Sequence, residues 1–364
     1  MKKSLVLLTA LFFLFKASGQ QHKTQNIVIV TLDGFRWQEV YRGADSALIN
    51  SKFTNQKNEV KKQFWAETAE DRRKKLLPFF WSVMVSKGQL YGNRDLGNSD
   101  EVSNIYHFSY PGYNEIFTGF SDKKINTNEP ITNPNMNILE YISKQKGFKN
   151  KVAVFSSWER FPQILNVNRS GLLVNSGYAN FNSPDIGPDF KLLNDLQQKA
   201  PHYLGDSTRL DFLTFGFAKS FLKQYKPKVL YLSFDETDDM AHAGNYQYYL
   251  QRANQEDGFL AELWNMLQCD EQYKDKTTLI ITCDHGRGDV PLERWKDHGF
   301  NIKNSEQTWF AVIGPDTAPN GIISTQTITY HNQIAQTISN LLGFDFKANA
   351  GHNVGDAIES VTAK

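Results

Sequence analysis

Residues 26–32 read NIVIVTL, and Asp33-Gly34 follows them directly. A continuous run of aliphatic and β-branched residues of this length is typical of a strand that is buried on both faces, as strands are in a parallel sheet. The carboxylate of Asp33 then stands where the strand ends and the chain turns. This arrangement, an apolar run with polar residues at its end, recurs along the chain and decides the fold class.

Four later stretches repeat the arrangement. They are residues 151–155 (KVAVF, then Ser156-Ser157), 229–234 (VLYLSF, then Asp235), 277–283 (TTLIITC, then Asp284-His285-Gly286) and 309–314 (WFAVIG, then Pro315). Patterns typical of helices lie between them, at residues 137–145, 210–224, 246–268 and 331–342. Strands that alternate with helices predict an α/β fold, with a mostly parallel central sheet and helices on both faces.

Two segments interrupt this alternation. Residues 42–100 and 166–207 are polar, charged and irregular. Functional sites of open α/β sheets form at the carboxyl ends of the strands. We therefore expect both segments to be insertions over that edge, within one domain that spans residues 20–364.

The first 19 residues differ from the rest of the chain. Lys2 and Lys3 precede an apolar run at residues 5–15, and small residues follow at 17–19. This run is too short to span a bilayer, so we predict a cleaved signal peptide and a secreted or periplasmic protein. No cysteine stands directly after the small residues, which argues against a lipid anchor.

Charge and cysteine content exclude some classes of protein. Without residues 1–19 the chain has 37 basic and 39 acidic side chains, against 40 and 39 in the full sequence. Such a balance gives no basic field for nucleic acid, so we expect no nucleic-acid-binding module. Cys269 and Cys283 are too few for a disulfide framework. They are either a single disulfide or free thiols, with Cys283 a small buried residue at the end of its strand.

Two pairs of residues have spacings that suit a metal ion. Asp238 and His242 are four residues apart, so on a helix they share one face. A solvated acid and a surface histidine would show the same spacing. Asp284 and His285 leave the end of a predicted strand, and Gly286 permits the bend that would bring both side chains together.

Asp33 and His298 complete the set of candidate ligands. A carboxylate at the tip of a buried strand needs a partner, which a metal ion or the start of a following helix would supply. His298 precedes the strand at 309–314. Carboxylates mixed with imidazoles suit Zn²⁺ best, with Mn²⁺ or iron possible and Ca²⁺ a poor fit. Two such ions would clamp the attacking and leaving oxygens of an in-line displacement.

Ser109 is the candidate nucleophile. It lies in Phe108-Ser109-Tyr110-Pro111-Gly112, ahead of a helical pattern that ends at Thr118-Gly119. A serine at the start of a helix is most often an N-cap. Coordination to a metal would instead lower the pKa of its hydroxyl and make it a nucleophile, and the helix amino end would favour anionic oxygens.

The order of these residues resembles that of the alkaline phosphatase superfamily, and most closely its nucleotide pyrophosphatase/phosphodiesterase branch. The resemblance spans about residues 26–345. Three stretches carry it. They are residues 31–35 (TLDGF), residues 109–111 (SYP) with 117–119 (FTG), and residues 298–299 (HG) with 310–315 (FAVIGP).

The resemblance implies two metal sites, with zinc as the preferred ion, and a role for each ligand. One site would consist of Asp238, His242 and His298. The other would consist of Asp33, Asp284, His285 and the Ser109 oxygen. It also implies an asparagine that binds a phosphoryl oxygen, for which Asn126 and Asn128 are candidates and Asn128 is preferred by spacing.

The implied activity is hydrolysis of phosphate monoesters or diesters through a phosphoseryl intermediate. Many phosphodiesterase relatives use threonine where this chain has Ser109. The difference weakens assignment to that branch, but a serine hydroxyl can serve as the same kind of nucleophile. A sulfatase would need an arginine at the position of Tyr113, so that activity is disfavoured. A phosphomutase or phosphotransferase on the same site, or a silent metal-binding relative, remain the alternatives.

The loop at residues 156–160 (SSWER) should lie at the same edge of the sheet. Arg160 resembles an arginine that some phosphomonoesterases of the superfamily place on the phosphate, since its planar fork binds two oxygens at once. An ion pair with Glu159 is the alternative. Tyr110, Tyr113 and Trp158 would form an aromatic wall for the substrate or would pack in the core.

Overall fold

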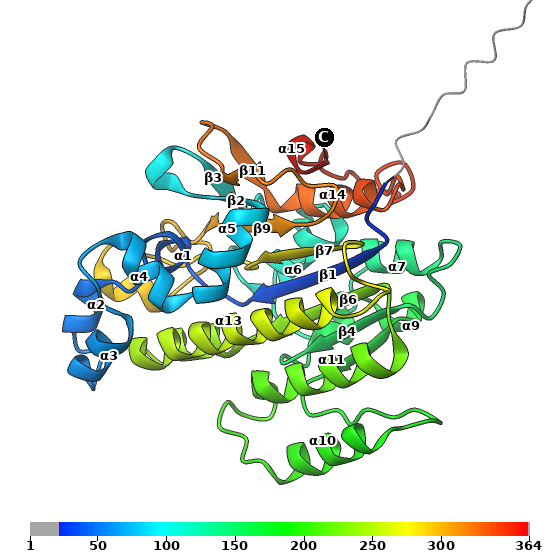
Figure 1. The fold of residues 1–364 in the computed structure, drawn as a ribbon, viewed down its shortest axis with the longest axis horizontal. Helices are drawn as coiled ribbons and strands as arrows, with labels where there is room; N and C mark the ends of the chain where they lie inside the picture. The colour runs from blue at the N-terminus through cyan, green and yellow to red at the C-terminus, as the bar shows by residue number, and fades with distance from the viewer. Residues whose placement is uncertain (1–21, 363–364) are drawn as a thin grey trace, which may run out of the picture.

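The strand at residues 26–32 lies in the middle of an eight-stranded sheet in the computed structural model, which describes residues 22–362 (Figure 1). The strand order is β10-β2-β9-β7-β1-β6-β4-β5. Their bounds are β1 (Asn26–Leu32), β2 (Gln89–Tyr91), β4 (Val152–Ser156), β5 (Leu173–Ser176), β6 (Val229–Phe234), β7 (Thr277–Thr282), β9 (Phe310–Ile313) and β10 (Gly321–Ile322). The predicted signal peptide lies outside the described residues.

Parallel pairing brings the polar strand ends together. β1 pairs in parallel with β6 on one side and with β7 on the other, and β4 pairs in parallel with β6. The residues that follow these strands therefore leave the sheet at one edge. β9 runs antiparallel to β7 and to β2, so the sheet is mostly parallel, as predicted.

Alternate residues of β1 enter two separate cores. Val28, Val30 and Leu32 belong to the core that includes residues of α11 (Asp211–Tyr225) and α13 (Tyr246–Gln268). Ile27 and Ile29 belong to the other core, with residues of α6 (Ser109–Thr118), α7 (Ile138–Ser143) and α14 (Ile334–Leu341). Burial on both faces explains why the run has no polar alternation. The predicted fold class is confirmed.

The segments predicted to be irregular contain regular structure, so that part of the prediction is wrong. Residues 42–100 form short helices, contribute β2 to the main sheet, and add β3 (Ser99–Glu101) to a small sheet with β8 (Gln307–Thr308) and β11 (Ile328–Tyr330). Residues 166–207 contribute β5 and a helix that contacts α11. Short elements give a weak periodic signal, and α4 buries only Leu76.

The remaining elements connect or cover the sheet. They are α1 (Trp37–Arg42), α2 (Ser46–Asn50), α3 (Lys57–Phe64), α4 (Ala69–Leu76), α5 (Val85–Lys87), α8 (Phe161–Ile164), α9 (Val167–Ser170), α10 (Pro188–Lys199), α12 (Glu236–His242) and α15 (Glu359–Thr362). α1 to α4 lie on the side towards which the arrow of β1 points, and α10 lies next to α11 at the opposite face from α14 (Figure 1). Within residues 22–362, no helix combines the length and the apolar character needed to cross a membrane.

Candidate metal centre

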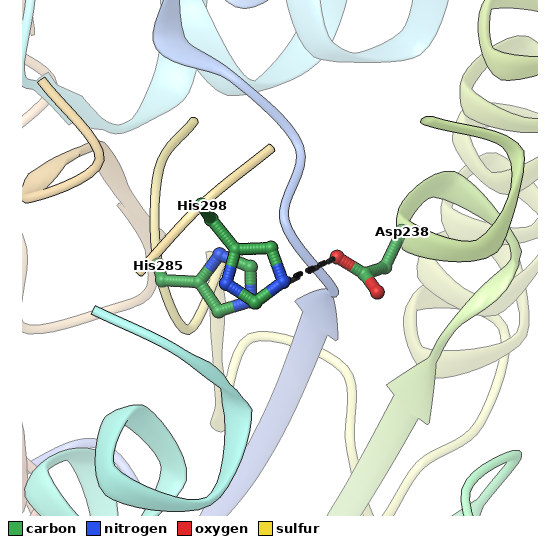
Figure 2. Close-up of side chains that lie close together, drawn as sticks. All are labelled: Asp238, His285 and His298. Carbon is green, nitrogen blue, oxygen red and sulfur yellow. Dashed lines mark ion pairs between the residues drawn. The ribbon is translucent and has the colours of Figure 1, made fainter. Parts of the chain in front are cut away.

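Strand ends and one short helix bring the predicted ligands together. Asp33 follows β1, Asp284 and His285 follow β7, and α12 begins just after β6 and carries Asp238 and His242 on one face. His298 comes from the connection between β7 and β8. The rings of His285 and His298 lie side by side and face the carboxylate of Asp238 across a short gap (Figure 2).

Three side chains form one end of the cluster. The Nε2 atom of His242 lies 2.9 Å from Nε2 of His298 and 3.1 Å from Oδ2 of Asp238. The Nε2 atom of His298 is 3.7 Å from Oδ1 of Asp238. The structure thus brings together the three residues predicted to form one site. His242 is the most exposed of them, with 47% of its side chain accessible.

The other end of the cluster is buried. The Nε2 atom of His285 lies 3.4 Å from Oδ1 of Asp33, 3.5 Å from Oδ2 of Asp284 and 3.5 Å from Oγ of Ser109. Asp33, Asp284 and His285 have no exposed surface, and Ser109 is 7% exposed. The four residues predicted to form the second site are therefore also neighbours.

The two ends of the cluster meet at His285. Ligand atoms of Asp33, Asp284 and His285 lie within 4.8 Å of one another, and the same holds for Asp238, His285 and His298. The imidazole of His285 stacks on that of His298, with ring centroids 3.9 Å apart. One histidine therefore faces both ligand sets, which sequence spacing could not indicate.

The donor set fits divalent cations. Oδ1 of Asp33 and Oδ2 of Asp284 are buried and make no hydrogen bond among the described residues; the charged group near each of them is the imidazole of His285, at 3.4 Å and 3.5 Å. Burying a charged oxygen without a partner is costly, and a metal ion is one partner that removes the cost. Carboxylate oxygens with imidazole nitrogens are a donor set that Zn²⁺ accepts.

Backbone carbonyls orient two of the imidazoles. Nδ1 of His285 lies 2.9 Å from the carbonyl oxygen of Gly286, and Nδ1 of His298 lies 3.1 Å from that of His107. A carbonyl can only accept, so each Nδ1 carries the proton and each Nε2 is left to face the cluster.

The electrostatics of the metal-free cluster centre on His285. Burial would lower the pKa of His285, but the charges of Asp284 and Asp33 outweigh burial and raise it to about 9. Burial would raise the pKa of Asp33, but the charged imidazole of His285, 3.4 Å away, outweighs burial and keeps that pKa below its ordinary value. Burial, together with the charge of Asp33, raises the pKa of Asp284 well above its ordinary value. Burial and the positive charge of His285 lower the pKa of His298 well below its usual range. The carboxylates around His285 thus favour its protonated form.

Ser109 is not an N-cap. The N-cap of α6 is Phe108, whose side chain makes no capping hydrogen bond, and Ser109 is the first helical residue. The Ser109 hydroxyl faces His285 instead. The helix approaches β7 very closely, since a Cβ atom at Gly112 would lie 2.2 Å from the carbonyl oxygen of Asp284. Glycine at this position lets the start of α6 reach the cluster.

Asn128 and Arg160 lie next to the start of the same helix. The backbone N–H of Tyr110 donates to Oδ1 of Asn128 at 2.9 Å. Nε of Arg160 donates to the carbonyl oxygen of Asn128 at 3.0 Å, and its guanidinium also pairs with Glu159. Arg160 therefore makes the ion pair with Glu159 that was the alternative to phosphate binding, and it also contacts Asn128.

Of the two alternatives for the aromatic residues, a wall for the substrate or packing in the core, two of the three side chains take the second. Tyr110 and Tyr113 are 1% and 0% exposed, so they pack in the core. The Tyr113 hydroxyl donates to Oδ2 of Asp33 at 2.8 Å. Trp158 is half-buried. Both cysteines are free thiols, Cys283 buried and Cys269 exposed.

Arg287 and His107 were not among the predicted site residues. Arg287 is buried and pairs with the Asp238 carboxylate, and His107 has a φ of 52° and supplies the carbonyl that holds His298. Arg287 stands two residues after His285, and His107 stands two residues before Ser109. Proximity to these motifs is the only sequence signal that could have indicated either residue.

Solved structures share the fold at low sequence identity. The alkaline phosphatase PafA has a TM-score of 0.56 at 10% identity, over 95% of this chain and 100% of PafA. The lipoteichoic acid synthase LtaP from Listeria monocytogenes has a TM-score of 0.57 at 11% identity, over 93% of this chain and 76% of LtaP. Murine ectonucleotide pyrophosphatase / phosphodiesterase 5, an inactive variant in complex with AMP, has a TM-score of 0.51 at 13% identity, over 91% and 97%.

No curated protein sequence matches the chain significantly. Residues 49–340 match the family described as type I phosphodiesterase / nucleotide pyrophosphatase. This match covers most of the chain, including Ser109 and every candidate ligand except Asp33. The chain therefore belongs to the type I phosphodiesterase / nucleotide pyrophosphatase family, and its structural neighbours include members of the alkaline phosphatase superfamily.

Proposed function

We propose that this protein is a secreted hydrolase of phosphate esters that uses two divalent metal ions, most suitably Zn²⁺, and Ser109 as nucleophile. Family membership indicates a phosphoester hydrolase. The observation that carries the finer proposal is the buried cluster around His285, where Oδ1 of Asp33 and Oδ2 of Asp284 have no hydrogen-bond partner among residues 22–362. Export rests on the composition of residues 1–19.

The proposed ligands divide into two sets that share one neighbourhood. Asp238, His242 and His298 would hold one ion, and Asp33, Asp284, His285 and the Ser109 oxygen would hold the other. When bound, the ions would supply positive charge to the phosphoryl group and lower the pKa of the serine hydroxyl. His285 faces both sets, so the side chains that would hold the two ions form one continuous cluster.

The residues at the start of α6 would carry out phosphoryl transfer. Oγ of Ser109 would attack phosphorus, the ester P–O bond would break, and the alcohol would leave opposite to Ser109. Water would then cleave the phosphoserine and release phosphate or a phosphate monoester. The protein would position these groups and stabilise the charge that develops on the phosphoryl oxygens, and catalysis of phosphoryl transfer depends mainly on these two effects.

Two groups beside Ser109 would bind a non-bridging phosphoryl oxygen. The backbone N–H of Tyr110 points at Oδ1 of Asn128 without substrate. A phosphoryl oxygen would take the place of that Oδ1 on the N–H, and the Asn128 amide would turn to donate to the same oxygen. Arg160, which contacts Asn128, would reach a second oxygen and favour dianionic monoesters.

Hydrolysis of an aryl phosphate and of an aryl phosphodiester, with and without added Zn²⁺, tests the proposal. The metal-free protein should be inactive, and Zn²⁺ should restore hydrolysis of at least one substrate with about two ions bound per chain. Hydrolysis by the protein without bound metal would contradict the two-metal site. Transfer of phosphate to an added alcohol in place of water would indicate a phosphotransferase or mutase. Zinc binding without turnover would indicate a silent relative.

A further inference from the structure

Arg287 is a buried arginine that contacts three segments of the metal centre at once. It is 1% exposed. Its Nε donates to the carbonyl oxygen of Gly34 at 3.0 Å, and its Nη1 donates to that of Lys296 at 2.8 Å. Its Nη2 donates to the carboxylate of Asp238 and lies 3.3 Å from the carbonyl oxygen of the same residue.

Each of these contacts lies beside a proposed ligand. Gly34 directly follows Asp33, and Lys296 stands two residues before His298. Asp238 is itself a proposed ligand. Arg287 stands two residues after His285. One guanidinium therefore connects the four segments that carry every proposed ligand other than Ser109.

We propose that Arg287 is a positioning residue that holds the two ligand sets at a fixed position relative to each other and fixes the rotation of the Asp238 carboxylate. This inference rests on the metal centre of the proposed function. Arg287 pairs with Oδ1 of Asp238, while Oδ2 lies 3.1 Å from Nε2 of His242. The guanidinium thus holds Oδ1, which also lies 3.7 Å from Nε2 of His298, and leaves Oδ2 to face His242.

Arginine suits this role and lysine does not. The guanidinium has five N–H donors in a rigid plane, so it can reach two carbonyls and a carboxylate that lie in different directions. A lysine ammonium keeps the charge but is a single point with freely rotating donors. Arg287→Lys therefore keeps the positive charge but removes the fixed arrangement of donors, so it tests the two contributions separately.

Gly34 leaves no free space around this contact. Its φ is +56°, and a Cβ atom there would lie 2.7 Å from Oδ1 of Asp238 and 2.8 Å from Nη2 of Arg287. Gly34→Ala would place a methyl group between the guanidinium and the carboxylate while both charged groups remain. It provides a second way to disturb the contact if Arg287→Lys does not fold.

Zinc affinity of the metal-free protein is the direct readout, measured by competition with a chromophoric chelator. Arg287→Lys should bind its weaker ion about 10- to 100-fold less tightly than the wild type, as is usual when a group that orients metal ligands is lost. Gly34→Ala should show a loss in the same direction. Circular dichroism and urea unfolding establish that each variant is folded.

Arg209→Lys is the matched control. Arg209 is also fully buried and donates to Asn175, Gln197 and the carbonyl oxygen of Ser156, none of which is a proposed ligand. This variant should lose stability with zinc affinity unchanged. A parallel loss of zinc affinity in Arg209→Lys would attribute the effect to general loosening and overturn the inference.

The remaining outcomes separate this inference from the proposed function. If Arg287→Lys or Gly34→Ala binds zinc as tightly as the wild type, Arg287 does not position the ligands and the proposed function stands. If the wild type binds zinc and hydrolyses no phosphoester, the proposed function fails while the role of Arg287 is still read from zinc affinity. If the wild type binds no divalent metal, both are overturned.

Discussion

The backbone carbonyl of His107 accepts a hydrogen bond from Nδ1 of His298 at 3.1 Å. His107 adopts a φ of 52°, in the left-handed region that few residues other than glycine visit. Its backbone N–H donates to Oδ1 of Asn104, and the Asn104 amide donates to Glu115 on α6. The strained residue thus connects the helix that begins with Ser109 to a proposed ligand.

We predict that His107→Val and His107→Gly differ, although both remove the ring and its contact with Ser305 at 3.1 Å. Glycine accepts the left-handed conformation, and valine resists it by roughly 1–2 kcal/mol. His107→Val should therefore be less stable to urea than His107→Gly and should bind zinc more weakly, because the carbonyl turns away from His298. Equal zinc affinities would show that the carbonyl does not orient this ligand.

Ser109→Ala should abolish turnover while the fold and most of the metal affinity remain. Loss of a nucleophile commonly removes several orders of magnitude in rate. Turnover of an aryl phosphate and metal content after dialysis should be measured on the same preparation. A variant that keeps more than about a tenth of wild-type activity would exclude Ser109 as nucleophile.

Arg160→Ala should reduce monoester hydrolysis by roughly 10- to 100-fold, a loss of ~1.5–3 kcal/mol that is typical of a charged hydrogen bond. Diester hydrolysis should fall much less, because a diester carries less charge on its phosphoryl oxygens. The ratio of kcat/KM for the two substrates is the measurement. Equal losses would indicate a structural role through Asn128.

Glu159→Gln is the control for Arg160. It removes the acidic partner of Arg160 and leaves the donation to the Asn128 carbonyl possible. If Arg160 binds phosphate, this change should leave monoester hydrolysis at or above the wild-type rate. A loss as large as that of Arg160→Ala would show that the ion pair, and not a phosphate contact, is what matters.

Zinc affinity should rise with pH up to about pH 9. The pKa of His285 is about 9 in the metal-free protein, raised above 6.5 by Asp284 and Asp33 against the effect of burial. A raised pKa means that the proton stays bound below pH 9, and zinc must displace it from Nε2. Calorimetry in buffers of different ionisation enthalpy should detect proton release on zinc binding. Affinity that stays constant between about pH 6 and pH 9 would contradict this picture.

Much of the fold could be predicted because its central elements are long and strongly patterned. β1 and α13 have the predicted bounds, residues 26–32 and 246–268. β2 and β5 were missed because strands of three and four residues are too short to show a period. Their place in the sheet depends on pairing with distant strands.

The strand-end residues of the candidate site were predictable for a geometric reason. Carboxyl ends of parallel strands meet at one edge, so a parallel sheet already placed Asp33 and Asp284 at the same edge, and the pairing of β1 with β7 makes them neighbours. Arg287 gave no such signal, because its contacts are with the backbone carbonyls of Gly34 and Lys296 and with the Asp238 side chain on α12. The burial of Tyr110 and Tyr113 could not be predicted either, because the sequence around an aromatic residue near a site does not show whether its side chain faces solvent or the core.

The position of β1 between β6 and β7 has a consequence for how the protein matures. β1 comes from residues 26–32, and its two neighbours come from residues 229–234 and 277–282. Pairings across such long stretches of chain must close large loops, which makes them slow to form. The ligand sets therefore do not exist until the last of these strands has been synthesised and docked. Metal uptake is then a late step in the folding of each chain. The time at which tightly bound zinc appears during refolding would therefore report when the sheet is complete.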